Sequence, residues 1–303
     1  MEFSVTILGS GAAVPTSRRN PSGQYIQIRN RHFLIDCGEG TQMQMRKFGV
    51  NFNRITHVFI SHLHGDHFFG LVGLLSTMHL MGRVKPIRIY GPIGLKQIIQ
   101  MQLEVAKGKL AFELIYREIE PHENTVLFED AKVMVTCFPL VHKIPTSGFK
   151  IQEKERERKL LAEKVQADGI KREYFHRLKK GEDIEEEGRI ISHLDYTEAA
   201  EKPKSYAYCS DTAFSDQTIA AVEGVSYLYH EATFVEVLRD RAIATKHSTA
   251  KDAAEVAKRA QVGKLLMGHL SARYDTGEQH LEEAKTIFEN AECVEDGQII
   301  EIL

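Results

Sequence analysis

His62-Leu63-His64-Gly65-Asp66-His67 places three imidazoles and one carboxylate within six residues, directly after the apolar run 55–60. His62 and His64 are two residues apart, so in an extended chain their side chains share one face. Gly65 permits a sharp turn that brings Asp66 and His67 round from another direction. The stretch therefore predicts ligands for two adjacent metal ions. The alternative, a solvated histidine-rich loop, does not explain why the stretch follows a buried strand or mixes imidazole with carboxylate.

The composition is typical of a globular enzyme. Of 303 residues, 43% are hydrophobic and 27% are charged, and 39 Lys and Arg against 42 Asp and Glu give a net charge of −3. A chain of this length can bury a sizeable core. Because the charges nearly balance, any nucleic-acid site must be local.

The N-terminus and the cysteines bear on location. Residues 1–9 lack a basic flank and a long apolar core, so we expect a first strand there and no export signal. No apolar stretch is long enough to span a bilayer, so no membrane association is expected. The cysteines form no CxxC pair, which fits a reducing cytoplasm. They are expected to pack as small apolar residues and are Cys37, Cys137, Cys209 and Cys293.

Short β-branched and aromatic runs, punctuated by Gly, Asn and Pro, dominate the first half. They predict strands at 3–8, 25–28, 32–35, 57–60, 87–90, 112–119 and 133–139. Three-and-four spacing of apolar residues predicts helices at 41–48, 68–78 and 95–105. Further strands are expected at 206–209, 225–229, 264–268 and 298–303, and helices at 249–260 and 277–291. The order is strands first, then strands alternating with helices.

A highly charged segment, residues 152–204, interrupts this pattern as an insertion. A solvated helical hairpin is one reading of it. The other is a phosphate-contacting patch, because five cations and two aromatics gather between 171 and 180. The candidate RNA-binding cations of this cluster are Lys171, Arg172, Arg177, Lys179 and Lys180.

Six residues cannot complete two coordination shells, and three further ligands follow apolar runs. His142, Asp211 and His269 each stand just past a predicted strand, where the ligands of a sheet protein gather. We assign His62, His64 and His142 to one ion. Asp66, His67 and His269 then hold the second, and Asp211 bridges the two. Histidine and carboxylate without paired thiolates favour two Zn²⁺, with Mn²⁺ or Fe as alternatives.

The HxHxDH motif with a later His, Asp and His resembles the metallo-β-lactamase superfamily, and further segments resemble its ribonuclease Z family, which matures transfer-RNA 3′ ends. The similarity runs nearly end to end. It covers residues 8–13, 15–20, 36–42, 230–233, 247–249 and 268–274.

The resemblance implies an α/β (α+β) fold, a four-layer αββα sandwich with the metal cleft along one edge. It implies a single domain, 1–303, with an inserted flexible arm, 152–204, that grips precursor transfer RNA, and a homodimer. Two features depart from the family. A Gly/Pro-rich arm tip is absent, and Ser17 stands where the loop before Arg18 and Arg19 is expected to carry Lys. Arg18 and Arg19 remain candidate RNA contacts.

The expected reaction is phosphodiester hydrolysis that leaves a 3′-hydroxyl on the transfer RNA and a 5′-phosphate on the trailer. Asp66, a ligand with a second oxygen, is the candidate general base. His247 is the candidate proton donor, with Glu231 orienting its ring. A capping role for His247 beside Ser248 is the alternative, and His230 is expected to support the site without binding metal.

Three rival functions each fit part of the sequence. A thioester, lactam or other phosphodiester hydrolase of the same fold would not need a charged arm of this length. An RNA endonuclease of this fold with a large cap domain would carry that cap between the last Asp and His ligands. The segment between Asp211 and His269 is too short to contain such a cap. A non-catalytic, metal-stabilised RNA-binding protein would not need the candidate general base Asp66 and proton donor His247.

Overall fold

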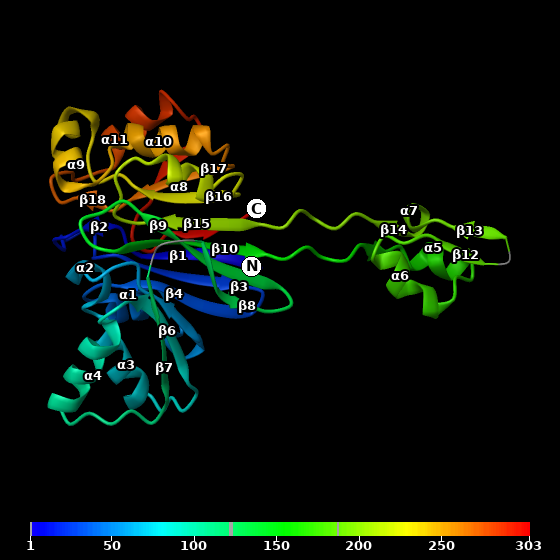
Figure 1. The fold of residues 1–303 in the computed structure, drawn as a ribbon, viewed down its shortest axis with the longest axis horizontal. Helices are drawn as coiled ribbons and strands as arrows, with labels where there is room; N and C mark the ends of the chain where they lie inside the picture. Colours follow the sequence, from blue (N-terminus) through cyan, green and yellow to red (C-terminus); the bar gives the residue numbers. More distant parts are fainter. Residues whose placement is uncertain (1, 121–123, 187) are drawn as a thin grey trace. The chain divides into compact units, whose positions relative to one another are not determined.

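The computed structural model describes residues 2–120, 124–186 and 188–303, and the chain divides into two compact units. Unit 1 comprises 1–129, 133–152 and 204–303, and unit 2 comprises 130–132 and 153–203. Every predicted metal ligand falls in unit 1, and the cationic cluster falls in unit 2 (Figure 1).

The first sheet of unit 1 has seven strands in the order β20-β1-β3-β4-β5-β6-β7. They are β1 (Phe3–Gly9), β3 (Gly23–Ile28), β4 (Arg31–Cys37), β5 (His57–Phe59), β6 (Ile87–Pro92), β7 (Leu114–Ile119) and β20 (Ile299–Glu301). The strands from β4 to β7 are parallel and their neighbours on the other side are antiparallel. Because parallel strands end at the same edge, the end of β4 lies beside the metal-binding stretch that follows β5.

The second sheet has the order β19-β17-β16-β15-β10-β9-β8. Its strands are β8 (Thr125–Glu129), β9 (Val133–Leu140), β10 (Thr146–Glu153), β15 (Ser205–Cys209), β16 (Tyr227–Glu231), β17 (Lys264–Gly268) and β19 (Ala291–Cys293). The run β15, β16, β17 is parallel. The residues that end or follow these three strands, among them Asp211, Glu231 and His269, therefore meet at one edge.

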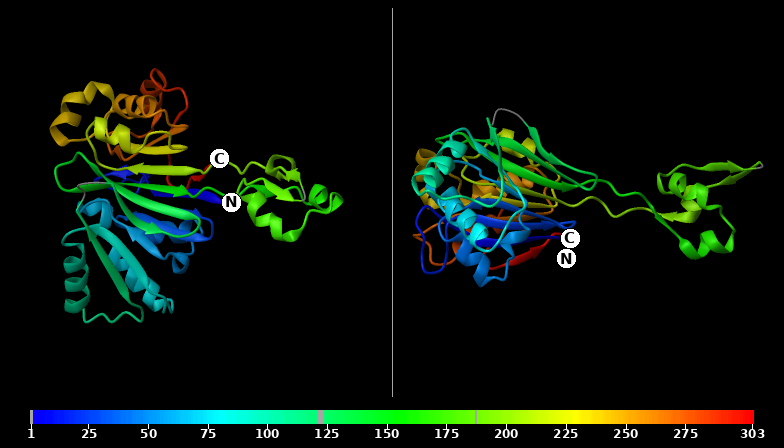
Figure 2. Two further views of the ribbon diagram at one scale, coloured as in Figure 1. Left: turned by 45° about the vertical axis from the view of Figure 1, so that its right-hand side comes forward. Right: turned by 90° about the horizontal axis from the view of Figure 1, so that it is seen from below.

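Four layers make up unit 1, as the sequence resemblance implied. The inner faces of both sheets share one apolar core, in which Phe3 and Val5 of the first sheet pack with Phe149 and Tyr206 of the second. Helices cover the outer face of each sheet through a separate core. Figure 1 and the two further views in Figure 2 show these layers.

The first sheet is covered by α1 (Thr41–Lys47), η1 (Phe52–Arg54), α2 (Gly65–Phe68), α3 (Leu71–Leu80) and α4 (Leu95–Val105). The second is covered by α8 (Asp216–Ala221), α10 (Ala250–Arg259) and α11 (Glu278–Lys285). The chain between β16 and α10 forms η3 (Glu236–Leu238) and α9 (Arg239–Thr245), and β2 (Gly11–Ala12) pairs with β18 (Leu270–Ser271).

Helix α10 shows how the sequence builds this covering layer. Thr249 caps the helix, accepting from the Asp252 amide while the Asp252 carboxylate accepts from the Thr249 amide, which satisfies two otherwise unpaired N–H groups. Ala253, Ala254 and Ala257 are fully buried, and their small side chains let the helix backbone lie close to the second sheet.

Unit 2 is a small α/β unit with its own apolar core. Its elements are β11 (Lys159–Leu160), α5 (Ala162–Ala167), η2 (Arg172–Tyr174), α6 (Phe175–Lys179), β12 (Ile184–Glu186), β13 (Arg189–Ile191), α7 (His193–Tyr196) and β14 (Thr197–Glu198). Two antiparallel pairs, β11 with β14 and β12 with β13, rule out the simple helical hairpin. The core consists of Val165, Ile170, Leu178, Ile184, Ile191 and Tyr196.

Most predicted elements occur, with differences at particular places. The helix expected over 277–291 ends at Lys285, because the chain must turn before Ala291 to pair β19 with β17. The helix expected over 68–78 extends to Leu80 as α3 and is separated from the short α2. The strands β8 and β10 were not expected, because β8 has only three consecutive apolar residues, and Lys and Gln interrupt the apolar pattern of β10.

We predict that Leu178→Ala loosens unit 2 alone. Leu178 is fully buried, and such a truncation costs about 2–5 kcal/mol, which a core of six side chains cannot absorb. Hydrogen exchange measured by mass spectrometry should accelerate across 153–203 and stay unchanged in unit 1. Equal acceleration in both units would contradict the separate core.

Candidate metal centre

The metal-binding stretch lies at the edge where β5 ends, with Gly65 opening the short helix α2. His62 and His67 are fully buried. A side chain at Gly65 would collide with the Phe69 ring, and one at Gly38 would collide with the Asp66 carbonyl. Glycine is thus required at position 65 because the Phe69 ring occupies the space of a side chain. Gly38 lets the end of β4 come close to residues 62–67.

The first group of ligand atoms contains three imidazoles and one carboxylate. His62, His64, His142 and Asp211 offer atoms that lie within 4.8 Å of one another. His64 Nδ1 is 3.0 Å from His62 Nε2 and 3.3 Å from His142 Nε2. Asp211 Oδ2 lies 3.4 Å from His62 Nε2 and 3.6 Å from His142 Nε2.

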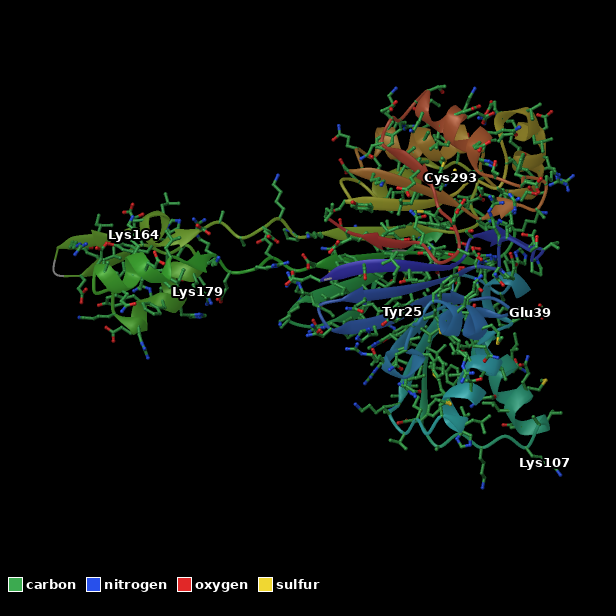
Figure 3. All side chains as sticks on the ribbon, turned by 180° about the vertical axis from the view of Figure 1, so that it is seen from behind. Tyr25, Glu39, Lys107, Lys164, Lys179 and Cys293 are labelled. Carbon is green, nitrogen blue, oxygen red and sulfur yellow. The ribbon has the colours of Figure 1, made fainter. Side chains whose placement is uncertain are left out.

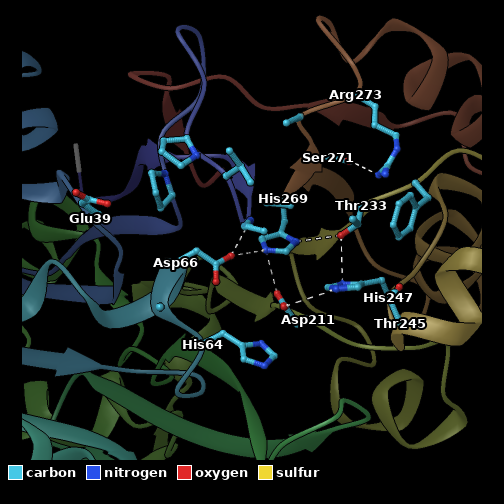
Figure 4. A pocket seen from close by; sticks show the side chains of 18 of the residues that line it. Glu39, His64, Asp66, Asp211, Thr233, Thr245, His247, His269, Ser271 and Arg273 are labelled. Carbon is cyan, nitrogen blue, oxygen red and sulfur yellow. Dashed lines mark hydrogen bonds and ion pairs between the residues drawn. The ribbon is translucent and has the colours of Figure 1, made fainter.

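The second group contains Asp66, His67 and His269, again within 4.8 Å of one another. Asp66 Oδ2 lies 3.4 Å from His67 Nε2 and 3.5 Å from His269 Nε2. The other oxygen of Asp211 faces this group, with Oδ1 at 3.3 Å from His67 Nε2 and 3.1 Å from His269 Nε2. Asp211 therefore presents one oxygen to each group, and Figure 4 shows it between His64 and His269.

A divalent cation fits this donor set. The Nε2 atoms of His67 and His269 are buried and hydrogen-bond to nothing in the described part of the chain, although carboxylate oxygens lie nearby. A buried polar atom without a partner is costly. Nitrogen and carboxylate oxygen converging in this way are what a metal ion would satisfy.

Ligating imidazoles must be neutral, and burial favours that state in three of the candidate ligands. Burial, with His67 nearby, lowers the pKa of His62 to about 4. Burial likewise lowers the pKa of His64 and His142.

Burial alone would also lower the pKa of His67, but the Asp211, Asp66 and Asp36 carboxylates outweigh it and raise that pKa, so His67 has to lose a proton to bind a metal. Burial alone would raise the pKa of Asp66, but the neighbouring His67 and His269 outweigh it and hold that pKa far below its ordinary value.

Asp36 orients the candidate ligand His67. Its Oδ2 accepts from His67 Nδ1 at 2.7 Å, from Tyr208 Oη at 2.7 Å and from Ser61 Oγ at 2.9 Å, and its Oδ1 accepts from the Ser61 amide at 2.7 Å. With the proton held on Nδ1, His67 Nε2 is free for a metal. Sequence reasoning missed this role, although Asp36 opens a segment that carried the family resemblance.

Two other candidate ligands are held in the same way. His142 Nδ1 donates to the Lys246 carbonyl at 2.9 Å. His269 Nδ1 lies 3.0 Å from Thr233 Oγ1, whose hydroxyl donates to Glu231 Oε2 at 2.7 Å. Each bond leaves the Nε2 of the imidazole facing the other ligands.

The half-buried His247 pairs with the buried Glu231 beside the two groups. His247 Nδ1 donates to Glu231 Oε1 at 2.7 Å, and its Nε2 is 4.0 Å from Asp211 Oδ2. Burial alone would lower the pKa of His247, but the Glu231 carboxylate raises it to about 9. The amides of Thr212 and Thr233 donate to Glu231, so the carboxylate cannot turn away from the ring.

The other candidate residues, His230, Arg18 and Arg19, form hydrogen bonds to backbone carbonyls. His230 is buried and its Nδ1 donates to the Glu231 carbonyl at 2.7 Å. Arg19 is buried and donates to the Tyr274 carbonyl at 2.7 Å, while Arg18 donates to the Asp275 carbonyl at 3.3 Å. Both arginines thus attach their loop to 274–275.

A cleft of about 790 Å³ opens over Asp66, Asp211, His247 and His269. Figure 4 shows these side chains gathered in the middle of the view, with Arg273 farther off near Ser271. Three candidate metal ligands and His247 can therefore be reached from solvent through this cleft.

The αββα sandwich with two His/Asp groups at its edge defines a metal-dependent hydrolase of the metallo-β-lactamase fold. Curated relatives named Ribonuclease Z span almost the whole chain. That of Bacteroides fragilis is 41% identical over 290 residues, covering 95% of both chains, and that of Parabacteroides distasonis is 40% identical over 302 residues, covering 99% of both. The chain belongs to the ribonuclease Z family.

Solved structures agree with this assignment. Human tRNase Z, short form, is 28% identical with a TM-score of 0.73, and each chain covers 99% of the other. YhfI of Bacillus subtilis, a metallo-β-lactamase fold protein, is 19% identical with a TM-score of 0.69 and shares the fold, with 99% of each chain covered. A family model described as Anti-Pycsar protein Apyc1 matches residues 3–160, which include the HxHxDH stretch but not Asp211, His247 or His269.

We predict that Asp36→Asn lowers metal affinity about 10–100-fold, the usual effect of losing the partner that orients a ligand. Tyr208→Phe removes one of the donors to Asp36 and should cost less. Tyr206→Phe is the matched control, because that buried hydroxyl donates to Gln24 instead. Competition against a chromogenic zinc chelator measures the affinity, and an unchanged value in Asp36→Asn would refute the role.

Proposed function

We propose that this chain removes the 3′ trailer of precursor transfer RNA by phosphodiester hydrolysis, leaving a 3′-hydroxyl on the transfer RNA and a 5′-phosphate on the trailer. As a member of the ribonuclease Z family, it is a metal-dependent endoribonuclease. The observation that carries the proposal is the placement of Asp211, with one oxygen toward each ligand group and His247 Nε2 4.0 Å from Oδ2.

Two Zn²⁺ per chain are proposed as the cofactors, and Mn²⁺ or Fe would suit the same donors. His62, His64 and His142 would hold one ion, Asp66, His67 and His269 the other, and Asp211 would bridge them. Two such cations make water a nucleophile at neutral pH and neutralise charge on the phosphoryl oxygens.

Asp66 is proposed as the general base. Its Oδ2 faces His67 and His269 and accepts from the Ala13 amide at 2.8 Å. No hydrogen bond to Oδ1 is formed within the described residues, so this oxygen is available to take a proton from the attacking water. The Ala13 contact keeps the carboxylate from rotating.

His247 is proposed as the general acid. Glu231 accepts the Nδ1 proton, which leaves Nε2 to carry the proton given to the departing 3′-oxygen. Glu231 has the orienting and charge-stabilising role that the buried aspartate has in a Ser-His-Asp triad. The helix-capping role considered for His247 falls to Thr249.

The rival readings are less well supported. A thioester or lactam hydrolase of this fold would leave the charged, separately cored unit 2 without a purpose. A large cap between Asp211 and His269 does not occur, since the inserted unit precedes Asp211. A non-catalytic RNA-binding protein would not need a proton donor buried against a carboxylate.

We predict that Asp66→Ala abolishes cleavage of a 3′-extended transfer-RNA precursor. His247→Ala should lower kcat by about 10²–10⁴-fold, the usual contribution of a general acid, while leaving bound metal nearly unchanged. Metal content by mass spectrometry and single-turnover cleavage separate the two effects. Full activity in metal-stripped protein would exclude the mechanism.

Unit 2 is proposed as the inserted arm that holds the RNA, within a single metallo-β-lactamase-fold domain. Three cations of its cluster are already paired, Lys171 with Glu186, Arg177 with Glu182 and Lys179 with Glu157. Figure 3 marks Lys179 on this unit. Arg172 and Lys180 are exposed and form no ion pair within the described residues, so they are the cations most available to phosphate.

We predict that the double change Arg172→Glu and Lys180→Glu weakens precursor binding and reduces its salt dependence, because each lost phosphate contact removes about one unit of slope. The matched control, Lys159→Glu with Lys202→Glu, reverses two exposed cations of the same unit outside the cluster. Filter binding at several salt concentrations measures both. Equal losses in the two double variants would refute a specific role for the cluster.

A homodimer is also proposed. Exposed apolar side chains stand on neighbouring helices that cover the first sheet, and a second copy would shield them. They include Met43 of α1, Leu80 of α3 and Met101 and Val105 of α4. Light scattering should return twice the chain mass of 34.4 kDa, and a monomer at working concentration would contradict the proposal.

The cytoplasm is the proposed location. All four cysteines are free thiols, and three of them are buried. Burial raises the pKa of Cys37 to about 12, so it packs as an apolar residue. Among the described helices, none is both long and apolar enough to cross a membrane. Cell fractionation would test the location.

A further inference from the structure

A second cleft, of about 870 Å³, reaches the same ligands. His64 lines both clefts, and His142 lines the second one. The other residues that line it are Leu63, Pro92, Ile93, Ile119, Glu120, Leu140, Lys143, Ile144, Pro145 and Thr146. The two clefts thus meet at a metal ligand.

The proposed reaction requires the transfer RNA and the trailer to leave the scissile phosphate in different directions. His247 lines the first cleft and protonates the leaving 3′-oxygen. The ribose that carries this oxygen, and the transfer RNA attached to it, must therefore lie in the first cleft. The trailer is joined to phosphorus through a different oxygen, so it must leave the phosphate in another direction.

We propose that the second cleft binds the first nucleotide of the trailer, with its base against the apolar wall and its following phosphate near Lys143. This inference rests on the proposed function, since only that reaction divides the substrate at the ligand cluster. The cleft is not an isolated apolar groove, because His64 and His142 make it continuous with the catalytic site.

The residues that line the second cleft suit any of the four bases. Ile93 is 59% exposed and Pro145 and Lys143 are also exposed, while Leu63 and Ile144 are half-buried. An apolar wall accepts the face of all four bases, because burying that face requires no hydrogen bond to a particular base edge. Trailers of different sequence would then bind alike.

The charge of the lining limits how many phosphates it can hold. Lys143 is its only lysine or arginine among the described residues, and Glu120 supplies a carboxylate. A long run of backbone phosphates would need several cations. The composition therefore fits one nucleotide and one phosphate, not an extended strand.

Ile93→Trp tests this directly. Ile93 lies between β6 and α4, outside both apolar cores of the first sheet, so a larger side chain there fills the cleft without disturbing folding. KM for a trailer-bearing precursor should rise at least about 5-fold, which corresponds to the loss of about 1 kcal/mol. The inhibition constant of mature transfer RNA, which has no trailer, and the metal content should not change.

Val84→Trp is the matched control, because Val84 is 72% exposed and lines neither cleft. A precursor with an abasic first trailer nucleotide should show the same KM rise with the parent protein and no further rise with Ile93→Trp. Lys143→Ala should reduce the salt slope of precursor binding by about one unit.

Cleavage of the intact precursor by Ile93→Trp with parental KM would overturn the inference while leaving the proposed function standing. So would a change of oligomeric mass in Ile93→Trp, because a second copy would then be the occupant. Failure of the parent protein to cleave any precursor would instead overturn the proposed function, and this inference with it.

Discussion

The site depends on one buried carboxylate. Asp211 is 3% exposed and stands between two groups of imidazoles, with one oxygen directed to each. Burying a charge is costly unless it is paired, and burial alone would raise the pKa of Asp211. The neighbouring His269 and His67 outweigh that effect and hold the pKa well below its ordinary value. The anion is stable in the interior only because both groups of ligands surround it.

That arrangement exists because two sheets end at one edge. The first sheet contributes the stretch after β5, and the second contributes His142, Asp211 and His269 after β9, β15 and β17. The shared core between the sheets holds these ends in register. A shift of either sheet would separate the two halves of the centre.

The backbone around the centre is held in an unfavourable conformation. Among the described residues, eight that are not glycine have positive φ, and four of them, Ala13, Asp36, Lys246 and His269, belong to the centre or bond to it, with φ between 54° and 56°. Ala13 donates to Asp66, Asp36 orients His67, and the Lys246 carbonyl orients His142. Such residues cost about 1–3 kcal/mol each and persist where the surroundings enforce them. Here they aim polar groups at the ligands.

The sequence by itself determined the chemistry of the centre. Spacing within residues 62–67 and the positions of His142, Asp211 and His269 after apolar runs pointed to a two-metal site, because ligand type and strand ends are local properties. The elements with clear periodicity, such as α4 and β17, were equally predictable. Only the tertiary structure decided what surrounds those residues. Asp36 orients His67 across 31 positions of sequence, and three cations of the cluster in unit 2, Lys171, Arg177 and Lys179, form ion pairs with glutamates. The contact of Asp36 arises from packing between distant segments, which no local pattern records.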